Sequence, residues 1–170
     1  MRERQGSETP PGCSVAYDAR RGGGRRGETL ELSGAGAIDE MIGRERHFLA
    51  ENALPPGGWF FARGWDQNKM AEKRFPNRRD LDLISTDAPL FFERSCGHIA
   101  VLNSAALKLL KIDGDFRISG GVVNTDGSGE PTGLISEAAV NWARKNIPEP
   151  SRETLEHWYG LAVDRMIKYG

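Results

Sequence analysis

The fold is decided by residues 89–102, which read PLFFERSCGHIAVL. Two mainly apolar runs, 89–94 and 99–102, lie on either side of a short polar break that contains a glycine. Short apolar runs bounded by turn residues are typical of buried strands. We therefore predict a strand, a bend at Gly97 and a second apolar segment, with the bend turning backbone and side chains toward a cavity.

Outward from this stretch, the pattern alternates between helices and strands. Apolar residues at helical spacing begin at Ile38 and stop before Pro55, and an aromatic run at 59–65 is typical of a strand. The other predicted elements are a helix capped by Asn103 or Ser104 that ends at Asp113-Gly114, a hairpin over 120–129, a helix over 133–146 and a last helix from Ser151. The alternation predicts an α/β fold with short strands and about four helices.

The composition narrows the class of protein and its partners. The chain has 170 residues, enough for about one domain, and its net charge of −1 argues against nucleic acid as a main partner. No apolar run reaches the ~18 residues of a membrane helix, no apolar leader follows Met1, and there are only two cysteines. These features predict a cytoplasmic protein without a membrane partner. Residues 1–28 contain few hydrophobic residues, so we expect them to be disordered.

The residues themselves leave the candidate chemistry open. His47 and His157 stand among charged neighbours, as surface histidines do, whereas His98 follows the bend at Gly97. His98 is compatible with a structural, hydrogen-bonded role or with a role in a cavity. Cys96 lies two residues before it, but nothing in the sequence specifies the oxyanion site that a cysteine nucleophile needs. The indoles of Trp59 and Trp65 suit either a core or a ligand platform.

Several collinear motifs carry a family resemblance. They are GWD at 64–66, FPNRRDLD at 75–82, DAPL at 87–90, CGHIAVLNSAAL at 96–107, GGVV at 120–123 and DGSGEPTGLISE at 126–137. In this order they resemble amidohydrolase family 3, a family of metal-dependent hydrolases. The similarity runs from about Leu30 to Gly170, which divides the chain into an unrelated or disordered segment, 1–28, and a partial amidohydrolase domain, 29–170.

The resemblance implies a fold and an activity. Members are similar to a metal-dependent (β/α)8 barrel, and this region matches an excursion after the first barrel strand. The implied reaction is hydrolysis of carbon–nitrogen bonds, amide-type but not peptide, by metal-activated water, with a divalent metal such as zinc. The family's metal site begins with a His-x-His pair, which this sequence lacks. We therefore expect a fragment that holds no metal and is inactive alone. The alternative is a non-catalytic binding or interaction module derived from the same fold.

The resemblance also suggests site residues. It implies that His98 is a catalytic residue and that Cys96, Asn103 and Glu137 line the substrate pocket. The implied partner is a small-molecule amide-type substrate of the full-length enzyme, with no role for nucleic acid or membrane.

Overall fold

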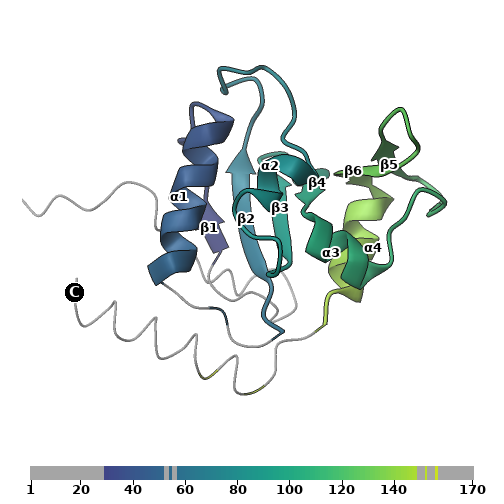
Figure 1. Cartoon of the computed structure of the whole chain (residues 1–170). Helices are drawn as coiled ribbons and strands as arrows, with labels where there is room; N and C mark the ends of the chain where they lie inside the picture. Colours follow the sequence, from purple (N-terminus) through teal and green to yellow (C-terminus); the bar gives the residue numbers. More distant parts are fainter. Residues whose placement is uncertain (1–28, 52–53, 55–56, 149–151, 153–155, 157–170) are drawn as a thin grey trace, which may run out of the picture.

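A single mixed sheet organises the part of the chain that the structure describes. The computed structural model describes residues 29–51, 54, 57–148, 152 and 156. The described strands are β1 (Thr29–Glu31), β2 (Phe60–Trp65), β3 (Leu90–Arg94), β4 (Ile99–Leu102), β5 (Gly121–Thr125) and β6 (Pro131–Glu137). The described helices of four residues or more are α1 (Ile38–Glu51), α2 (Arg78–Asp82), α3 (Ser104–Leu110) and α4 (Ala138–Asn146) (Figure 1). The α/β class predicted from the sequence is confirmed.

The strand order decides where a site can form. The sheet runs β1-β2-β3-β4-β6-β5, and β1, β2 and β3 are parallel to one another. β4 is antiparallel to β3 and to β6, so β6 runs in the direction of β3. The carboxyl ends of β1, β2, β3 and β6 therefore share one edge, here called the carboxyl edge. In open α/β sheets, ligands bind outside the carboxyl ends of the strands.

Alternation along the strands builds a core on each face of the sheet. Leu90 and Phe92 of β3 join the core under α1 and α2, while Phe91 joins the core under α3 and α4. Figure 1 shows α1 at one side of the sheet and α3 and α4 at the other. Trp65 lies in the first core and Trp59 in the second, each almost fully buried. Both indoles are therefore core residues rather than a ligand platform.

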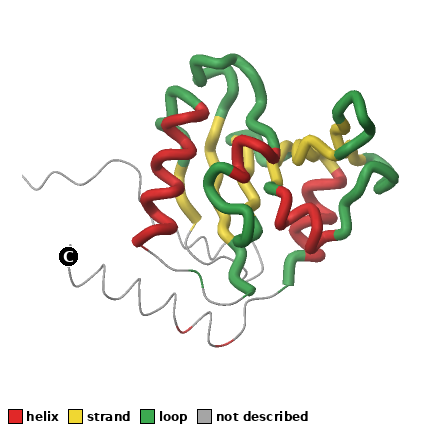
Figure 2. The backbone as a smooth tube through the Cα atoms, in the orientation of Figure 1, coloured by secondary structure: helices red, strands yellow, loops and turns green. Residues whose placement is uncertain are grey.

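Two loops meet over the first core. They are residues 32–37, which lead into α1, and residues 66–77, which follow β2 (Figure 2). The backbone N–H of Ala71 donates to the Gly36 carbonyl at 2.8 Å and joins them. Loop 66–77 ends at Asn77, whose side chain caps α2 in a capping box with Asp80. The loop therefore begins at the carboxyl edge, where β2 ends, and is fixed at its far end by the cap of α2.

The predicted helix over 133–146 is wrong in its first turn. Residues up to Glu137 belong to β6, where Ala100 and Val101 pair with Ile135 and Leu134, and the helix begins only at Ala138. Gly133 has a φ of +91°, which a helix does not accommodate, and a Cβ there would lie 2.3 Å from the Leu102 carbonyl oxygen. Close backbone packing therefore holds this segment extended.

One further helix ends earlier than the sequence predicts. The helix that follows Asn103 ends at Leu110, with Lys111 in the left-handed conformation as its C-cap, rather than at Asp113-Gly114. Residues 1–28, predicted to be disordered, and the helix predicted from Ser151 fall outside the described residues.

Among the described helices, none combines the length and apolar character needed to cross a membrane.

Candidate functional site

The candidate site is the turn between β3 and β4, at the carboxyl edge. The Gly97 N–H donates to the Arg94 carbonyl at 2.9 Å and closes the turn. Gly97 has a φ of +76°, a region that residues with a side chain rarely adopt. The turn predicted at this glycine is confirmed. It leaves Cys96 and His98 exposed on the surface.

His98 and Glu137 are neighbours in this turn although they are far apart in the sequence. Nδ1 of His98 lies 3.4 Å from Oε2 of Glu137, and the side chains are 69% and 60% exposed. The Glu137 N–H also donates to the His98 carbonyl at 2.8 Å. A carboxylate at Nδ1 orients an imidazole and leaves Nε2 free to exchange a proton with a ligand. The structure thus brings two of the four predicted site residues within ion-pair distance of each other.

Glu137 has an unusual backbone conformation. Its φ is +56° and its ψ −123°, at the junction of β6 and α4. A side chain with positive φ in this region is strained by about 1–3 kcal/mol, and such strain concentrates at functional sites. The conformation is held by the bond from Glu137 to His98 and by one from the Ala138 N–H to the Gly120 carbonyl, 3.1 Å long. The fold therefore maintains Glu137 in a costly position beside His98.

Cys96, the third predicted site residue, is held in the same turn. Partial desolvation would raise the pKa of its thiol, but backbone hydrogen bonds from His98 and Ile99 and the guanidinium of Arg94 lower it below its ordinary value. A lowered pKa increases the thiolate fraction and hence nucleophilicity toward external electrophiles. Cys96 is thus an exposed, anion-stabilised group next to the His98–Glu137 pair.

Arg94 joins the turn to the end of β2. Its Nε donates to Oε1 of Gln67 at 2.8 Å, and its Nη2 donates to Oδ1 of Asp66 at 3.0 Å. The pKa of Asp66 is lowered, first by the Asn68 backbone N–H and also by Arg94. The sequence analysis missed both Arg94 and Asp66 as site residues. The available signal was a charged residue at the end of β3 and another directly after β2.

Asn103, the fourth predicted residue, lies elsewhere. It follows β4 at the end opposite His98, five residues or roughly 16 Å away along an extended strand. Its side chain is fully buried and bonded to four backbone groups: Oδ1 accepts from Leu90 and Ala106, and Nδ2 donates to the carbonyls of Ser85 and Ala88. Every hydrogen-bonding position of this amide is used by the backbone. The structure does not bring Asn103 to the turn.

The described residues do not fit a metal centre. Within the described ranges, no group of three or more His, Cys, Asp or Glu side chains is placed to hold a metal ion. His47 is far from the turn in sequence and pairs with Glu51 on α1 at 3.5 Å. His98 has Glu137 as its acidic partner but no second histidine described beside it. A tightly bound catalytic metal needs three or four protein ligands.

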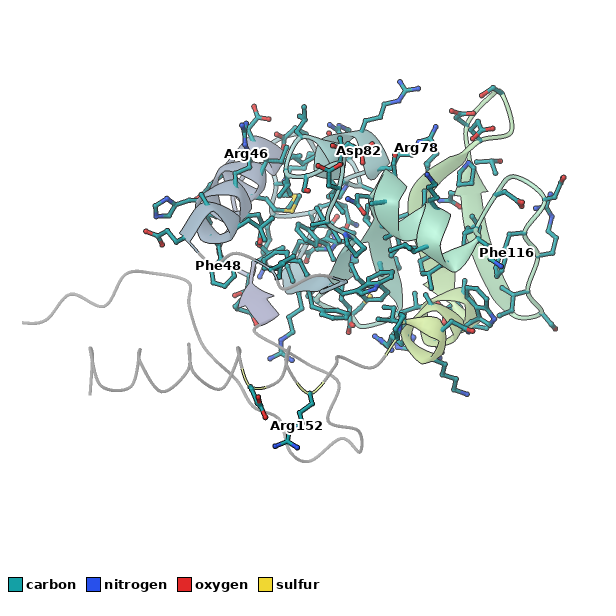
Figure 3. All side chains as sticks on the ribbon, turned by 60° about the horizontal axis from the view of Figure 1, so that its bottom comes forward. Arg46, Phe48, Arg78, Asp82, Phe116 and Arg152 are labelled. Atoms are coloured by element: carbon teal, nitrogen blue, oxygen red, sulfur yellow. The ribbon has the colours of Figure 1, made fainter. Side chains whose placement is uncertain are left out.

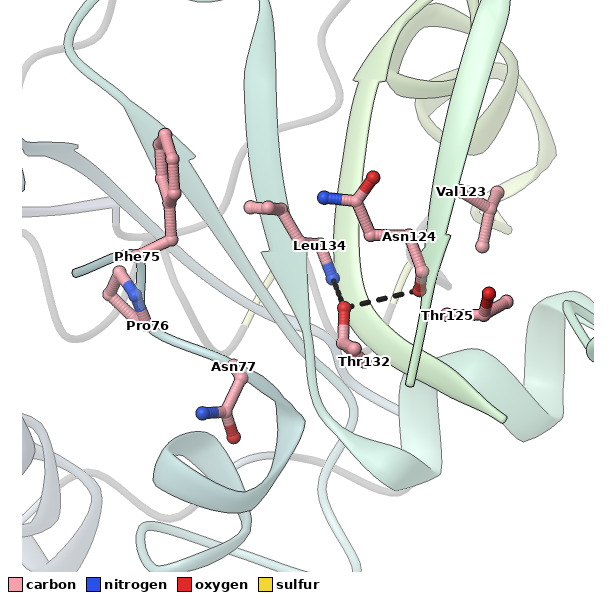
Figure 4. A pocket seen from close by; sticks show the side chains of 8 residues that line it. All are labelled: Phe75, Pro76, Asn77, Val123, Asn124, Thr125, Thr132 and Leu134. Carbon is pink, nitrogen blue, oxygen red and sulfur yellow. Dashed lines mark hydrogen bonds between the residues drawn. The ribbon is translucent and has the colours of Figure 1, made fainter. Parts of the chain in front are cut away.

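A shallow groove lies on the sheet face beyond α2. Its volume is about 510 Å³, and Figure 4 shows its lining. The lining residues are Phe75, Pro76, Asn77, Val123, Asn124, Thr125, Thr132 and Leu134. Arg78 of α2 lies toward the turn between β5 and β6 (Figure 3), with Nη1 3.8 Å from Oε2 of Glu130. The polar side chains of the groove are hydroxyls and amides, and none of its lining residues is charged.

Comparisons with known proteins place the chain among hydrolases. A family model described as the amidohydrolase family matches residues 22–170. YtcJ of Bacillus subtilis is 31% identical over 150 residues, which cover 86% of this chain and 27% of YtcJ. The N-substituted formamide deformylase of Arthrobacter pascens is 36% identical over 106 residues, which cover 61% of this chain and 19% of the deformylase.

A solved structure supports the same assignment. A metal-dependent hydrolase from Pyrococcus horikoshii, described as uncharacterized, matches with a TM-score of 0.56 and 29% identity over 81% of this chain and 25% of that protein. The chain therefore spans about a quarter of the length of the relatives it matches. The family match begins at residue 22, a few residues before the boundary predicted at 29.

Proposed function

This chain belongs to the amidohydrolase family, and from that premise we propose that it serves the hydrolysis of amide-type, non-peptide carbon–nitrogen bonds in small molecules. The deformylase relative supports this substrate class, since its name gives an N-substituted formamide as substrate. The segment would form one wall of the substrate pocket. The (β/α)8 barrel proposed for full-length members would supply the remaining walls.

The His98–Glu137 pair at the carboxyl edge is the observation that carries the proposal. In our account the His98 ring is protonated, and its Nδ1–H donates a hydrogen bond to the Glu137 carboxylate, which fixes the ring. Nε2 then donates a hydrogen bond to the oxygen that gains negative charge when an amide carbonyl is attacked. A donor aimed at developing charge contributes about 2.7–4 kcal/mol to transition-state stabilisation. Cys96 would line the pocket beside His98.

We propose that the full-length relatives require a divalent metal for the reaction, with zinc as the expected ion. The described residues do not fit such a centre, so no step of the account passes through it. We propose that this chain alone is inactive. We also propose a cytoplasmic location and no nucleic-acid or membrane partner, which the net charge of −1 and the composition support.

A chimera tests the proposed reaction. Residues 29–148 would replace the matching segment of full-length YtcJ. The purified chimera would be assayed for release of amine and carboxylate from a panel of N-substituted formamides, which yield formate, and of other small amides, which yield their own carboxylates. Hydrolysis by the chimera and none by the 170-residue chain is the expected result. A folded chimera that hydrolyses no member while unmodified YtcJ does would contradict the proposal.

A second candidate function is a non-catalytic binding module. The lack of a metal-ligand group among the described residues favours it, as does the groove beside α2. Such a module must fold alone, whereas a pocket wall leaves apolar surface for the rest of a domain. A sharp, reversible melt of the monomeric chain would favour the module.

A further inference from the structure

Arg144 of α4 reaches across to the site turn. Its Nη2 lies 2.6 Å from Oε2 of Glu93, the residue before Arg94 at the end of β3. The same guanidinium donates to the Gly97 carbonyl at 3.1 Å. Arg144 and Glu93 are mostly buried, with side chains 29% and 18% exposed. A partly buried, charge-assisted contact of this kind is stronger than an exposed ion pair.

The two carbonyls that shape the turn are both held by residues at or within α4. Arg144 binds the Gly97 carbonyl, and the Glu137 N–H at the start of the same helix binds the His98 carbonyl. Glu93 also packs beside Gly97, where a Cβ would lie 3.4 Å from its Oε1. The turn is therefore fixed to α4 and to Glu137, the residue just before that helix. Losing one of these two hydrogen bonds would let the His98 imidazole move relative to the Glu137 carboxylate.

We propose that Arg144 and Glu93 are positioning residues that set the geometry of the His98–Glu137 pair. The proposal rests on the function proposed for that pair, and neither residue touches substrate in it. Arg144 holds the backbone on one side of His98, and Glu93 holds Arg144 in place. Cys96 lies in the same turn and reports on its geometry.

The test uses the full chain and needs no turnover, so its failure is distinct from failure of the proposed hydrolase reaction. In a Cys13→Ser background, Cys96 is the single thiol, and its alkylation by iodoacetamide is followed as a function of pH. The ¹H–¹³C ring signals of His98 are assigned with His98→Gln. Circular dichroism confirms that each variant is folded.

Arg144→Gln should move the His98 ring signals toward their positions in Glu137→Gln. It should also shift the alkylation profile of Cys96 to higher pH by about half a unit or more, because a loosened turn withdraws backbone donors from the thiolate. Arg144→Lys should restore part of both effects. Glu93→Gln should reproduce them, and the double variant should not add to them, as expected for one coupled pair.

Lys145→Gln, an exposed change on the same helix, is the matched control and should alter neither readout. Unchanged ring signals and an unchanged alkylation profile in folded Arg144→Gln would overturn the proposal. If Arg144→Gln does not fold, unchanged readouts in both Arg144→Lys and Glu93→Gln would overturn it. Additive effects in the double variant would also overturn it, because the residues would then act separately.

Discussion

Glu45 carries a fully buried carboxyl group in the middle of the apolar face of α1. Neither carboxylate oxygen has a hydrogen-bond partner, and burial raises the pKa of the group to about 9. The ordinary value is 4.5, so the folded state favours the protonated form. An unpaired charge at this position is costly because the interior solvates it poorly.

This burial predicts a pH-dependent stability. The contribution of Glu45 is full below pH 4.5 and is lost as the pH rises toward 9, because the unfolded chain releases the proton first. Over that window the free energy of unfolding should fall by up to about 1.4 kcal/mol per pH unit. Glu45→Gln should remove this slope in urea unfolding at pH 5 and pH 8. Equal slopes in Glu45→Gln and the parent chain would contradict the assignment.

The strained backbone of Glu137 predicts a stabilising substitution. Glycine adopts a φ of +56° without a side-chain penalty. Glu137→Gly should therefore raise the free energy of unfolding by about 1 kcal/mol, while Glu137→Ala, which keeps the strain, should not. Both are measured by urea unfolding. A lower stability in Glu137→Gly than in Glu137→Ala would show that the conformation is not strained.

At the scale of elements, Asn103 joins α3 to β3 and to the loop before it. Its amide bonds the backbone of Leu90, Ala106, Ser85 and Ala88 at 2.8–3.0 Å. Asn103→Ala should lower the free energy of unfolding by about 3 kcal/mol or more, because it leaves several buried backbone groups unpaired. Asn124→Ala, at an exposed position in β5, is the control and should cost little. Similar losses in both variants would contradict this role.

The elements predicted correctly are those with a local signal. The aromatic run of β2, the apolar run of β3 and the glycine turn at 97 each carry their own cue. Residues 133–137 of β6 have a helical pattern in the sequence because they pass into α4 without a loop, and their apolar residues continue the helical spacing of α4. The backbone at Gly133 is extended because it packs closely against the Leu102 carbonyl. This contact exists only in the folded chain, so the sequence does not reveal it.

The same distinction holds for the site. The turn with Cys96 and His98 was predictable from Gly97, because a local bend exposes its own side chains. The partners Asp66, Glu93 and Arg144 come from three separate elements, and only the strand order brings them together. Asn103 is adjacent in sequence to the apolar run that follows the turn, yet the extended strand β4 places it at the opposite edge of the sheet.

At the scale of the whole molecule, the sheet is open at both outer strands. β1 and β5 have no partner strand on their outer sides among the described residues. Val122 of β5 is 52% exposed. Open edges and exposed apolar groups favour association between chains.

The open edge predicts self-association. Val122→Lys should reduce the light scattering of a concentrated solution of the protein, because a charge on an edge strand opposes strand pairing between two chains. Leu109→Lys changes a comparably exposed apolar residue on α3, 60% exposed, and is the control. If the two variants reduce scattering equally, general surface apolarity and not the β5 edge causes the association.

The central claim is that His98 at the carboxyl edge acts on an amide substrate. The most direct measurement is the turnover of His98→Gln in the YtcJ chimera that contains residues 29–148, compared with His47→Gln, a change to an exposed histidine on α1. His98→Gln should lower kcat by about 10²-fold or more with the melting temperature little changed, and His47→Gln should leave both unchanged. An unchanged kcat in folded His98→Gln would contradict the account.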